Sequence, residues 1–345
     1  MLNFYPGPSK IHPSVEKHIQ EGLQKGLFSF NHRSEVFQKM YQETVHQLHD
    51  YLQIPQDYFV YFLSSATECW EVISQSFVAT KSHHLYNGAF GEKWFQNASS
   101  LGNEVEASQF HYNQSPALPT TNADVICVTH NETSNGSLLP SHCLEATKKN
   151  NPNALIAVDA TSSLGGMEID LGLADIWFAS VQKCFGLPAG LGLLICSPKA
   201  IKRGLIVDKD QHYNSFIKLH TNALKWQTTH TPNILGIYLL GKIVHELGVI
   251  KKVHAEMIEK RELLNSFFSM HSAFDFLIDN DNLRSPLTLA ITHETPLSVL
   301  ADAKEKNIIL GKGYGEWKDN TFRIANFPAI SSTEINQLID YLKTL

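Results

Sequence analysis

Short apolar runs alternate with stretches of helical periodicity through the first two thirds of this 345-residue chain. Such runs are typical of strands buried on both faces, because a strand with one exposed face alternates apolar and polar residues. When helices separate such strands, the expected product is a mostly parallel sheet covered by helices on both faces. The expected strands are residues 58–63, 83–87, 124–129, 154–159, 176–179 and 190–195.

The remainder of the chain predicts a second, smaller α+β unit. A helical pattern runs from residue 231 to about residue 270, followed by expected strands at 287–292 and 321–325 and expected helices at 296–306 and 332–342. Residues 14–52 are also helical in pattern, with an interruption at 28–33. We expect a large unit of residues 14–240, and a small unit formed by an N-terminal arm (1–13) and residues 241–345.

Composition restricts the class of protein. A formal net charge of −6 does not suit nucleic-acid binding, which needs a basic surface. Five cysteines without paired spacing favour a reducing compartment over a disulfide framework. The first residues lack a secretory-signal pattern, and no apolar run is long enough to cross a bilayer. We expect a cytoplasmic protein that binds neither nucleic acid nor membrane.

Polar residues follow the expected strands at the edge where open α/β sheets bind ligands. Asp159 ends strand 154–159, and Lys183 follows strand 176–179 within ASVQKCFGLPAGLGLLI. Thr133 follows strand 124–129, Phe90 follows strand 83–87, and Ser-Ser-Ala-Thr at 64–67 precedes a helix. Each has an ordinary explanation when taken alone: a turn or cap residue, a solvated lysine, a core ring.

Together, these residues match the requirements of pyridoxal 5′-phosphate (PLP). A lysine amine condenses with its aldehyde, and a carboxylate keeps its ring nitrogen protonated. Helix N-terminal amides bind its phosphate, and an aromatic side chain covers its ring. A lysine held as a Schiff base is no longer a free ammonium, so Lys183 can be buried between apolar runs.

The chain resembles the class V PLP-dependent aminotransferases of fold type I, and within them the phosphoserine aminotransferases. The resemblance covers nearly the whole chain, and the Asp and Lys segments are its strongest part. It rests on the segments NFYPGPSKIHP, FNHRSEVF, HNETSNG, VDATSSLGG, SVQKCFGLPAGL, THTP and TFRIANFPA. It implies a large domain with a mostly parallel seven-stranded sheet, a smaller C-terminal domain, and a homodimer with shared active sites.

The resemblance also implies residue roles. Lys183 is the cofactor lysine and the acid–base group, Asp159 pairs with the ring nitrogen, and Arg323 binds the substrate α-carboxylate. The other expected cofactor contacts are Ala66, Thr67, Phe90, Thr133 and Gln182 of one subunit, with His230 and Thr231 of its partner.

The substrates implied are phosphoserine and 2-oxoglutarate, an activity of serine biosynthesis, but two departures leave an alternative open. Glu68 stands where phosphoserine enzymes resemble one another in having an arginine, and the His-Arg pair expected before Arg323 is missing. His32 and Arg33 are the remaining candidates for the substrate side chain. The alternative is an alanine- or serine-type donor with glyoxylate or pyruvate as acceptor.

Other functions are less well supported. A desulfurase needs a mobile cysteine, and Cys184 follows the lysine directly, with Gln182 where a histidine is expected. A non-catalytic binding protein predicts a damaged cofactor set. The 17 histidines lack metal-ligand spacing, and we expect no metal.

Overall fold

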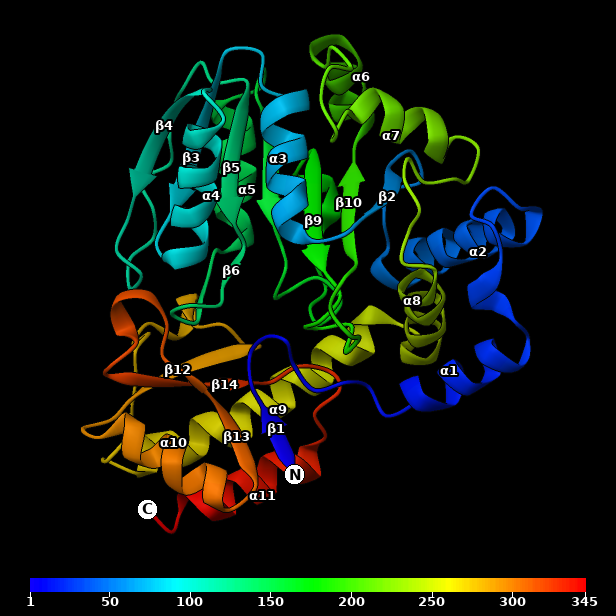
Figure 1. Ribbon diagram of the computed structural model, residues 1–345. Helices are drawn as coiled ribbons and strands as arrows, with labels where there is room; N and C mark the ends of the chain where they lie inside the picture. Colours follow the sequence, from blue (N-terminus) through cyan, green and yellow to red (C-terminus); the bar gives the residue numbers. More distant parts are fainter.

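The computed structural model describes residues 1–345 and contains two main sheets, each packed against helices (Figure 1). The large sheet has seven strands in the order β2-β10-β9-β8-β5-β3-β4. β10 is antiparallel to both of its neighbours, and all other pairs of the sheet are parallel, so the expected mostly parallel sheet is confirmed. The strands are β2 (Phe59–Leu63), β3 (Lys81–Tyr86), β4 (Glu104–Gln109), β5 (Val125–Thr129), β8 (Leu155–Asp159), β9 (Ile176–Ser180) and β10 (Gly192–Cys196).

Both faces of the large sheet are buried, which explains its continuous apolar runs. On β9, Trp177 and Ala179 face one hydrophobic core, whereas Ile176 and Phe178 face the other. Helices α3 (Ala66–Ser76), α4 (Ala89–Ser100), α6 (Pro198–Val207) and α7 (Phe216–Ala223) cover the Phe178 face. Helices α2 (Glu35–Leu52), α5 (Ser141–Asn150) and α8 (Ile234–Leu247) cover the Trp177 face.

The small sheet joins the two ends of the chain. Its order is β1-β13-β14-β12-β11, and β1 of the N-terminal arm pairs in parallel with β13. Its strands are β1 (Leu2–Phe4), β11 (Asp275–Phe276), β12 (Thr288–Thr292), β13 (Ile308–Lys312) and β14 (Thr321–Ala325). Helices α9 (Ile250–Met270), α10 (Pro296–Glu305) and α11 (Ser332–Leu342) lie around it (Figure 1).

The remaining elements are short. They are α1 (Val15–Gln24), the hairpin β6 (Asn131–Glu132) and β7 (Ser137–Leu138), and the 3₁₀ turns η1 (Leu27–Ser29), η2 (Leu171–Leu173), η3 (Asp281–Leu283) and η4 (Gly315–Trp317). None of the helices combines the length and apolar character needed to cross a bilayer.

Three details differ from the expected pattern. The helical pattern of 231–270 is two helices, because Gly248 takes a φ of +76° between α8 and α9. Residue 240, where we expected the large unit to end, lies inside α8. Strands β4 and β13 were not expected; β4 is an edge strand with half-exposed polar residues and therefore lacks an apolar run.

Candidate active site

Lys183 lies in the turn that follows β9, at the carboxyl edge of the large sheet. The N-terminal arm covers this turn, since the Ser9 N–H donates to the Gln182 carbonyl and a Cβ on Gly7 would lie 3.0 Å from Lys183 Cε. Lys183 is consequently only 7% exposed. The Gln182 side chain is half-buried beside it.

Burial makes the charged form of the Lys183 amine less favourable than it is in water. Its Nζ donates to Thr133 Oγ1 at 2.8 Å and lies 5.2 Å from the centre of the Phe90 ring. Burial lowers the pKa of Lys183 to about 8, although the Asp159 and Glu132 carboxylates act in the opposite direction. An amine with this pKa can accept or donate a proton near neutral pH.

Asp159 ends β8, which lies beside β9, so the sheet brings it to the same edge as Lys183. It is 5% exposed, and its Oδ1 accepts a hydrogen bond from the Thr161 N–H at 2.9 Å. Burial raises the pKa of the Asp159 carboxyl, whereas Thr161 and the Lys183 charge lower it. A cation brought against this carboxylate would stabilise its ionised form.

Thr133 is held by a hydrogen-bond network between the β6–β7 hairpin and the loop after β8. The Ser162 hydroxyl donates to the Asn131 carbonyl at 2.8 Å. It accepts from Asn131 Nδ2 at 2.7 Å and from Thr133 Oγ1 at 2.9 Å. Because the Thr133 hydroxyl donates to Ser162, its oxygen is free to accept from Lys183.

Glu132 positions Phe90 by capping α4 and is not identified by the sequence alone. Helix α4 starts after Gly88, which has no capping side chain. The buried Glu132 Oε2 accepts instead from the N–H groups of Phe90 at 3.2 Å and Gly91 at 3.1 Å. A Cβ on Gly88 would overlap the Glu132 side chain. Glycine has no side chain that could accept a hydrogen bond from the first N–H groups of the helix. A glycine before an expected helix therefore indicates that a residue elsewhere in the chain accepts these hydrogen bonds.

The start of α3 forms the wall of a cavity of about 520 Å³. The Ala66 N–H donates to Ser180 Oγ at 2.7 Å, which ties the helix start to the end of β9. Thr67, His230 and Thr231 of this same chain line the cavity. A helix N-terminus attracts anions, so these residues suit a phosphate group; the contribution of His230 and Thr231 to a partner's site stays a prediction.

Arg323 reaches the site from β14 of the small sheet. It is 4% exposed; its Nη1 donates to the Thr133 carbonyl and its Nε to the Lys312 carbonyl, both at 2.9 Å. Burial lowers the pKa of Arg323, and the Tyr5 hydroxyl and Glu132 oppose this effect. The rest of the planar guanidinium remains available for a carboxylate.

The structure does not bring His32 and Arg33 to this centre within one chain. Arg33 is exposed, and its Nη1 donates to Asn222 Oδ1 at 2.9 Å and to Gln227 Oε1 at 2.7 Å. Its Nη2 donates to the Thr229 carbonyl at 3.3 Å. Arg33 therefore lies beside the loop that carries His230 and Thr231 and makes no hydrogen bond to Lys183, Asp159 or Arg323.

Glu68 adds negative charge to the same cavity that the α3 start borders. Its Oε2 accepts hydrogen bonds from the Ser64 N–H and from Ser64 Oγ, both at 2.6 Å. The carboxylate is thus held at the helix start, where an arginine would otherwise favour a substrate phosphate.

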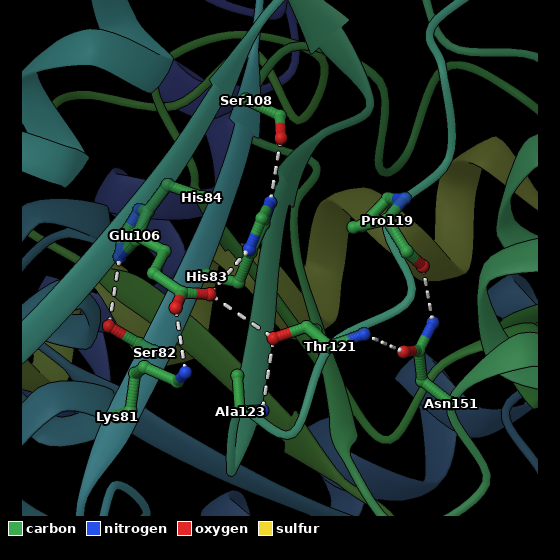
Figure 2. A network of polar contacts seen from close by, with 10 residues as sticks. All are labelled: Lys81, Ser82, His83, His84, Glu106, Ser108, Pro119, Thr121, Ala123 and Asn151. Atoms are coloured by element: carbon green, nitrogen blue, oxygen red, sulfur yellow. Dashed lines mark hydrogen bonds and ion pairs between the residues drawn. The ribbon is translucent and has the colours of Figure 1, made fainter.

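The adjacent histidines of β3 belong to a structural network rather than to a metal site (Figure 2). His83 contacts Glu106 Oε2 at 3.3 Å and Ser108 Oγ at 2.9 Å, and Glu106 also accepts from Lys81 at 2.7 Å. His84 lies on the opposite face of the strand, edge-on to Trp94. The contacts of His83 and Lys81 join β3 to the edge strand β4. No group of three or more potential metal-ligating side chains is assembled in the structure.

The residues at the sheet edge fit PLP. They supply an amine with a lowered pKa, a buried carboxylate without a cationic partner in contact, an aromatic ring and a helix N-terminus. Two buried hydroxyl oxygens beside them, Thr161 Oγ1 and Ser9 Oγ, have no hydrogen-bond partner. Unpaired buried polar atoms are expected in a site that encloses a polar molecule.

Comparisons with known proteins agree with this assignment. The family model "Aminotransferase class-V" matches residues 1–313. A phosphoserine aminotransferase of Corynebacterium glutamicum is 30% identical, over 97% of this chain and 93% of its own. The crystal structure of a phosphoserine aminotransferase from Cytophaga hutchinsonii is 33% identical, with a TM-score of 0.94 over 99% of this chain and 98% of that one. An aspartate aminotransferase of Thermus thermophilus, 20% identical over 99% of this chain and 97% of its own, shares the fold with a TM-score of 0.88.

Proposed function

Because this chain belongs to the class V aminotransferases, we propose that it is a phosphoserine:2-oxoglutarate aminotransferase. The enzyme is a PLP-dependent transferase of fold type I. The observation that carries the proposal is one chain of contacts, in which the Thr133 hydroxyl accepts from Lys183 and the Thr133 carbonyl accepts from Arg323. A lysine and a carboxylate-binding arginine thus lie on either side of a single residue.

Four features of the chain would hold the cofactor. Lys183 would bond its aldehyde carbon, Asp159 would face its ring nitrogen, Phe90 would cover its ring, and the α3 start would bind its phosphate. When bound, PLP supplies an electron-withdrawing ring that acidifies the Cα–H bond of an attached amino acid.

The protein residues then orient the substrate and move its proton. Arg323 binds the α-carboxylate with its remaining donors, which fixes the Cα near Lys183. The Lys183 Nζ takes the proton from Cα, because burial has lowered its pKa to about 8. The arm residues Gly7 and Ser9, which cover Lys183, exclude water from this transfer.

Similarity to the Cytophaga and Corynebacterium enzymes, at 33% and 30% identity over nearly the whole chain, supports phosphoserine as the donor. A second candidate is an alanine- or serine-type donor with glyoxylate or pyruvate. The observation in its favour is Glu68, whose carboxylate is held at the cavity wall where it would repel a substrate phosphate.

We also propose a homodimer with shared active sites, located in the cytoplasm. Within one chain, Arg33 makes its hydrogen bonds to Asn222, Gln227 and Thr229 and not to residues of the Lys183 site, which supports its use by a partner's site. The five cysteines are all free and buried, as in proteins of reducing compartments. We propose the division into residues 14–240 and residues 1–13 with 241–345 because each part contains its own sheet, with α8 running across the boundary.

A half-reaction screen tests the function. The PLP-loaded enzyme is mixed separately with phosphoserine, glutamate, serine and alanine, and loss of the cofactor's original absorbance is followed. Rapid, saturable conversion by phosphoserine and glutamate is expected. Conversion by alanine or serine with phosphoserine inert would favour the second candidate instead.

Two controls address the cofactor assignment. Borohydride reduction followed by peptide mapping is expected to place PLP on Lys183, and Lys183→Ala is expected to abolish turnover while the protein remains folded. A protein that never takes up PLP, or a fully active Lys183→Ala variant, would refute the assignment.

A further inference from the structure

Tyr314, in the connection from β13 to β14, joins the small sheet to the cofactor-facing helix. Its ring stacks on the Phe90 ring, with centres 5.1 Å apart and planes 11° apart. Its hydroxyl accepts a hydrogen bond from Lys93 Nζ at 2.5 Å. The central carbon of the Arg323 guanidinium lies 5.3 Å from the Tyr314 ring centre. One side chain therefore contacts both the expected cofactor-covering ring and the expected carboxylate-binding arginine.

The local backbone permits this close approach. Gly315 has a φ of +61°, and a Cβ on it would lie 3.1 Å from the Ala89 Cβ at the start of α4. A left-handed backbone without a side chain allows the connection to lie against the helix. Lys93 is on α4, one turn beyond Phe90, and its ammonium is 4.8 Å from the Tyr314 ring centre. The Tyr314 side chain is therefore fixed to α4 by stacking, by a hydrogen bond and by a cation–π contact.

We propose that Tyr314 is a positioning residue for transamination, which holds Phe90 and Arg323 in their working arrangement. The inference rests on the proposed function in that the substrate is an amino acid whose α-carboxylate binds Arg323. The stacked Tyr314 ring restricts the Phe90 ring, and its π face restricts the guanidinium. Lys93 fixes the hydroxyl end, so the small sheet and α4 must be docked for the arrangement to form.

Through Arg323, Tyr314 affects binding of the α-carboxylate, a group that all amino donors share. Loss of Tyr314 therefore affects donors of every side chain by a similar factor. A residue that recognised the substrate side chain would instead change the ranking of donors. The distinction separates positioning from specificity.

The kinetic test uses Tyr314→Ala, Tyr314→Phe and Lys93→Met in the PLP-loaded enzyme. Tyr314→Ala is expected to raise KM about tenfold for each donor that the wild type accepts, with a smaller effect on kcat. Tyr314→Phe and Lys93→Met are each expected to raise KM by roughly two- to fivefold. Tyr314→Phe removes only the hydrogen bond, whereas Lys93→Met also removes the cation–π contact, so the double variant should match Lys93→Met. Tyr112→Phe is the matched control, since Tyr112 packs edge-on against Trp317 in the same region without contacting Phe90 or Arg323.

A second measurement does not depend on turnover. Absorbance titration of the cofactor-free protein with PLP is expected to give a several-fold larger Kd for Tyr314→Ala, because Phe90 loses its support, and an unchanged Kd for Tyr314→Phe. Thermal unfolding confirms that each variant is folded. Unchanged KM and Kd in Tyr314→Ala, or an effect on one donor alone, would overturn the proposal. If the wild type accepts no donor, the proposed function fails, and the PLP titration still decides the role of Tyr314.

Discussion

Replacing Lys183 with methionine should stabilise the cofactor-free protein near neutral pH. The Lys183 amine is buried, and burial lowers its pKa from 10.5 to about 8. Below pH 8 the amine is charged in both the folded and the unfolded chain, so folding includes the full cost of burying an ammonium. Between pH 8 and 10.5 the unfolded chain binds more protons than the folded one, and wild-type stability therefore rises with pH. The methionine variant lacks this dependence, so its advantage is largest below pH 8.

The size of the effect follows from the pKa shift. The difference between the ordinary pKa of 10.5 and the value of about 8 in the folded protein corresponds to about 3 kcal/mol. Loss of the hydrogen bond to Thr133 Oγ1 offsets about 1 kcal/mol, and the Thr133 hydroxyl keeps its bond to Ser162. The variant is therefore expected to be more stable by about 2 kcal/mol at pH 7, and by about zero at pH 10.

Lys260 on α9 provides the matched control. It is 2% exposed, and burial also lowers its pKa to about 8. Its Nζ donates to the carbonyls of Phe327 at 3.2 Å and Ile330 at 2.6 Å, and methionine would leave both without this donor, at a cost of about 1–3 kcal/mol each. Because Lys183→Met itself loses about 1 kcal/mol of hydrogen bonding, Lys260→Met should lie about 1–5 kcal/mol below it in stability.

Urea unfolding of the three cofactor-free proteins at pH 7 and pH 10 measures these differences. A Lys183→Met variant no more stable than wild type at pH 7 would refute the reasoning. So would an advantage of equal size at both pH values, because it would not arise from the burial of charge.

Three further changes test other parts of the site. Gly88→Ala forces a Cβ into the Glu132 side chain, so it should lower the free energy of unfolding by about 1–3 kcal/mol and weaken PLP binding. Thermal unfolding and PLP titration measure the two effects, and a variant that behaves like the wild type would contradict the close contact between Gly88 and Glu132. Glu132→Gln replaces an acceptor of the Phe90 and Gly91 N–H groups and should cost about 1–3 kcal/mol in urea unfolding, whereas no loss would show that the cap is dispensable. Asp159→Asn should lower kcat by roughly 100-fold or more with the fold retained, and near-normal turnover would remove its assigned role.

The central residues of the site could be predicted from the sequence because strand ends are a topological property. Once the expected strands 154–159 and 176–179 are neighbouring and parallel, Asp159 and Lys183 must lie at one edge of the sheet. The boundaries of β14, which carries Arg323, were likewise predictable, since its residues are buried throughout. Local patterns sufficed for these features.

Contacts between distant segments could not be predicted in this way. The carboxylate of Glu132 caps a helix that begins more than forty residues earlier in the chain, and Tyr314 reaches Phe90 only because two sheets dock. Edge strand β4 carries polar residues that satisfy the network of His83 and Glu106 (Figure 2), so no continuous apolar run marks it. These features depend on tertiary packing, which overrides local preference.

The charges of the site explain why it should be less stable empty than occupied. Lys183 and Arg323 are two buried cations, and the charge of Arg323 further lowers the pKa of Lys183. Glu132 and Asp159 are two buried carboxylates whose pKa values are raised by burial. Glu132 is used by the folded chain to cap α4. Lys183, Asp159 and Arg323 are not optimal for the folded chain alone, and each gains when a group of opposite charge or a covalent bond arrives. The unfavourable burial in the empty protein thus becomes binding energy for cofactor and substrate, which is why substitutions that stabilise the empty site should abolish its chemistry.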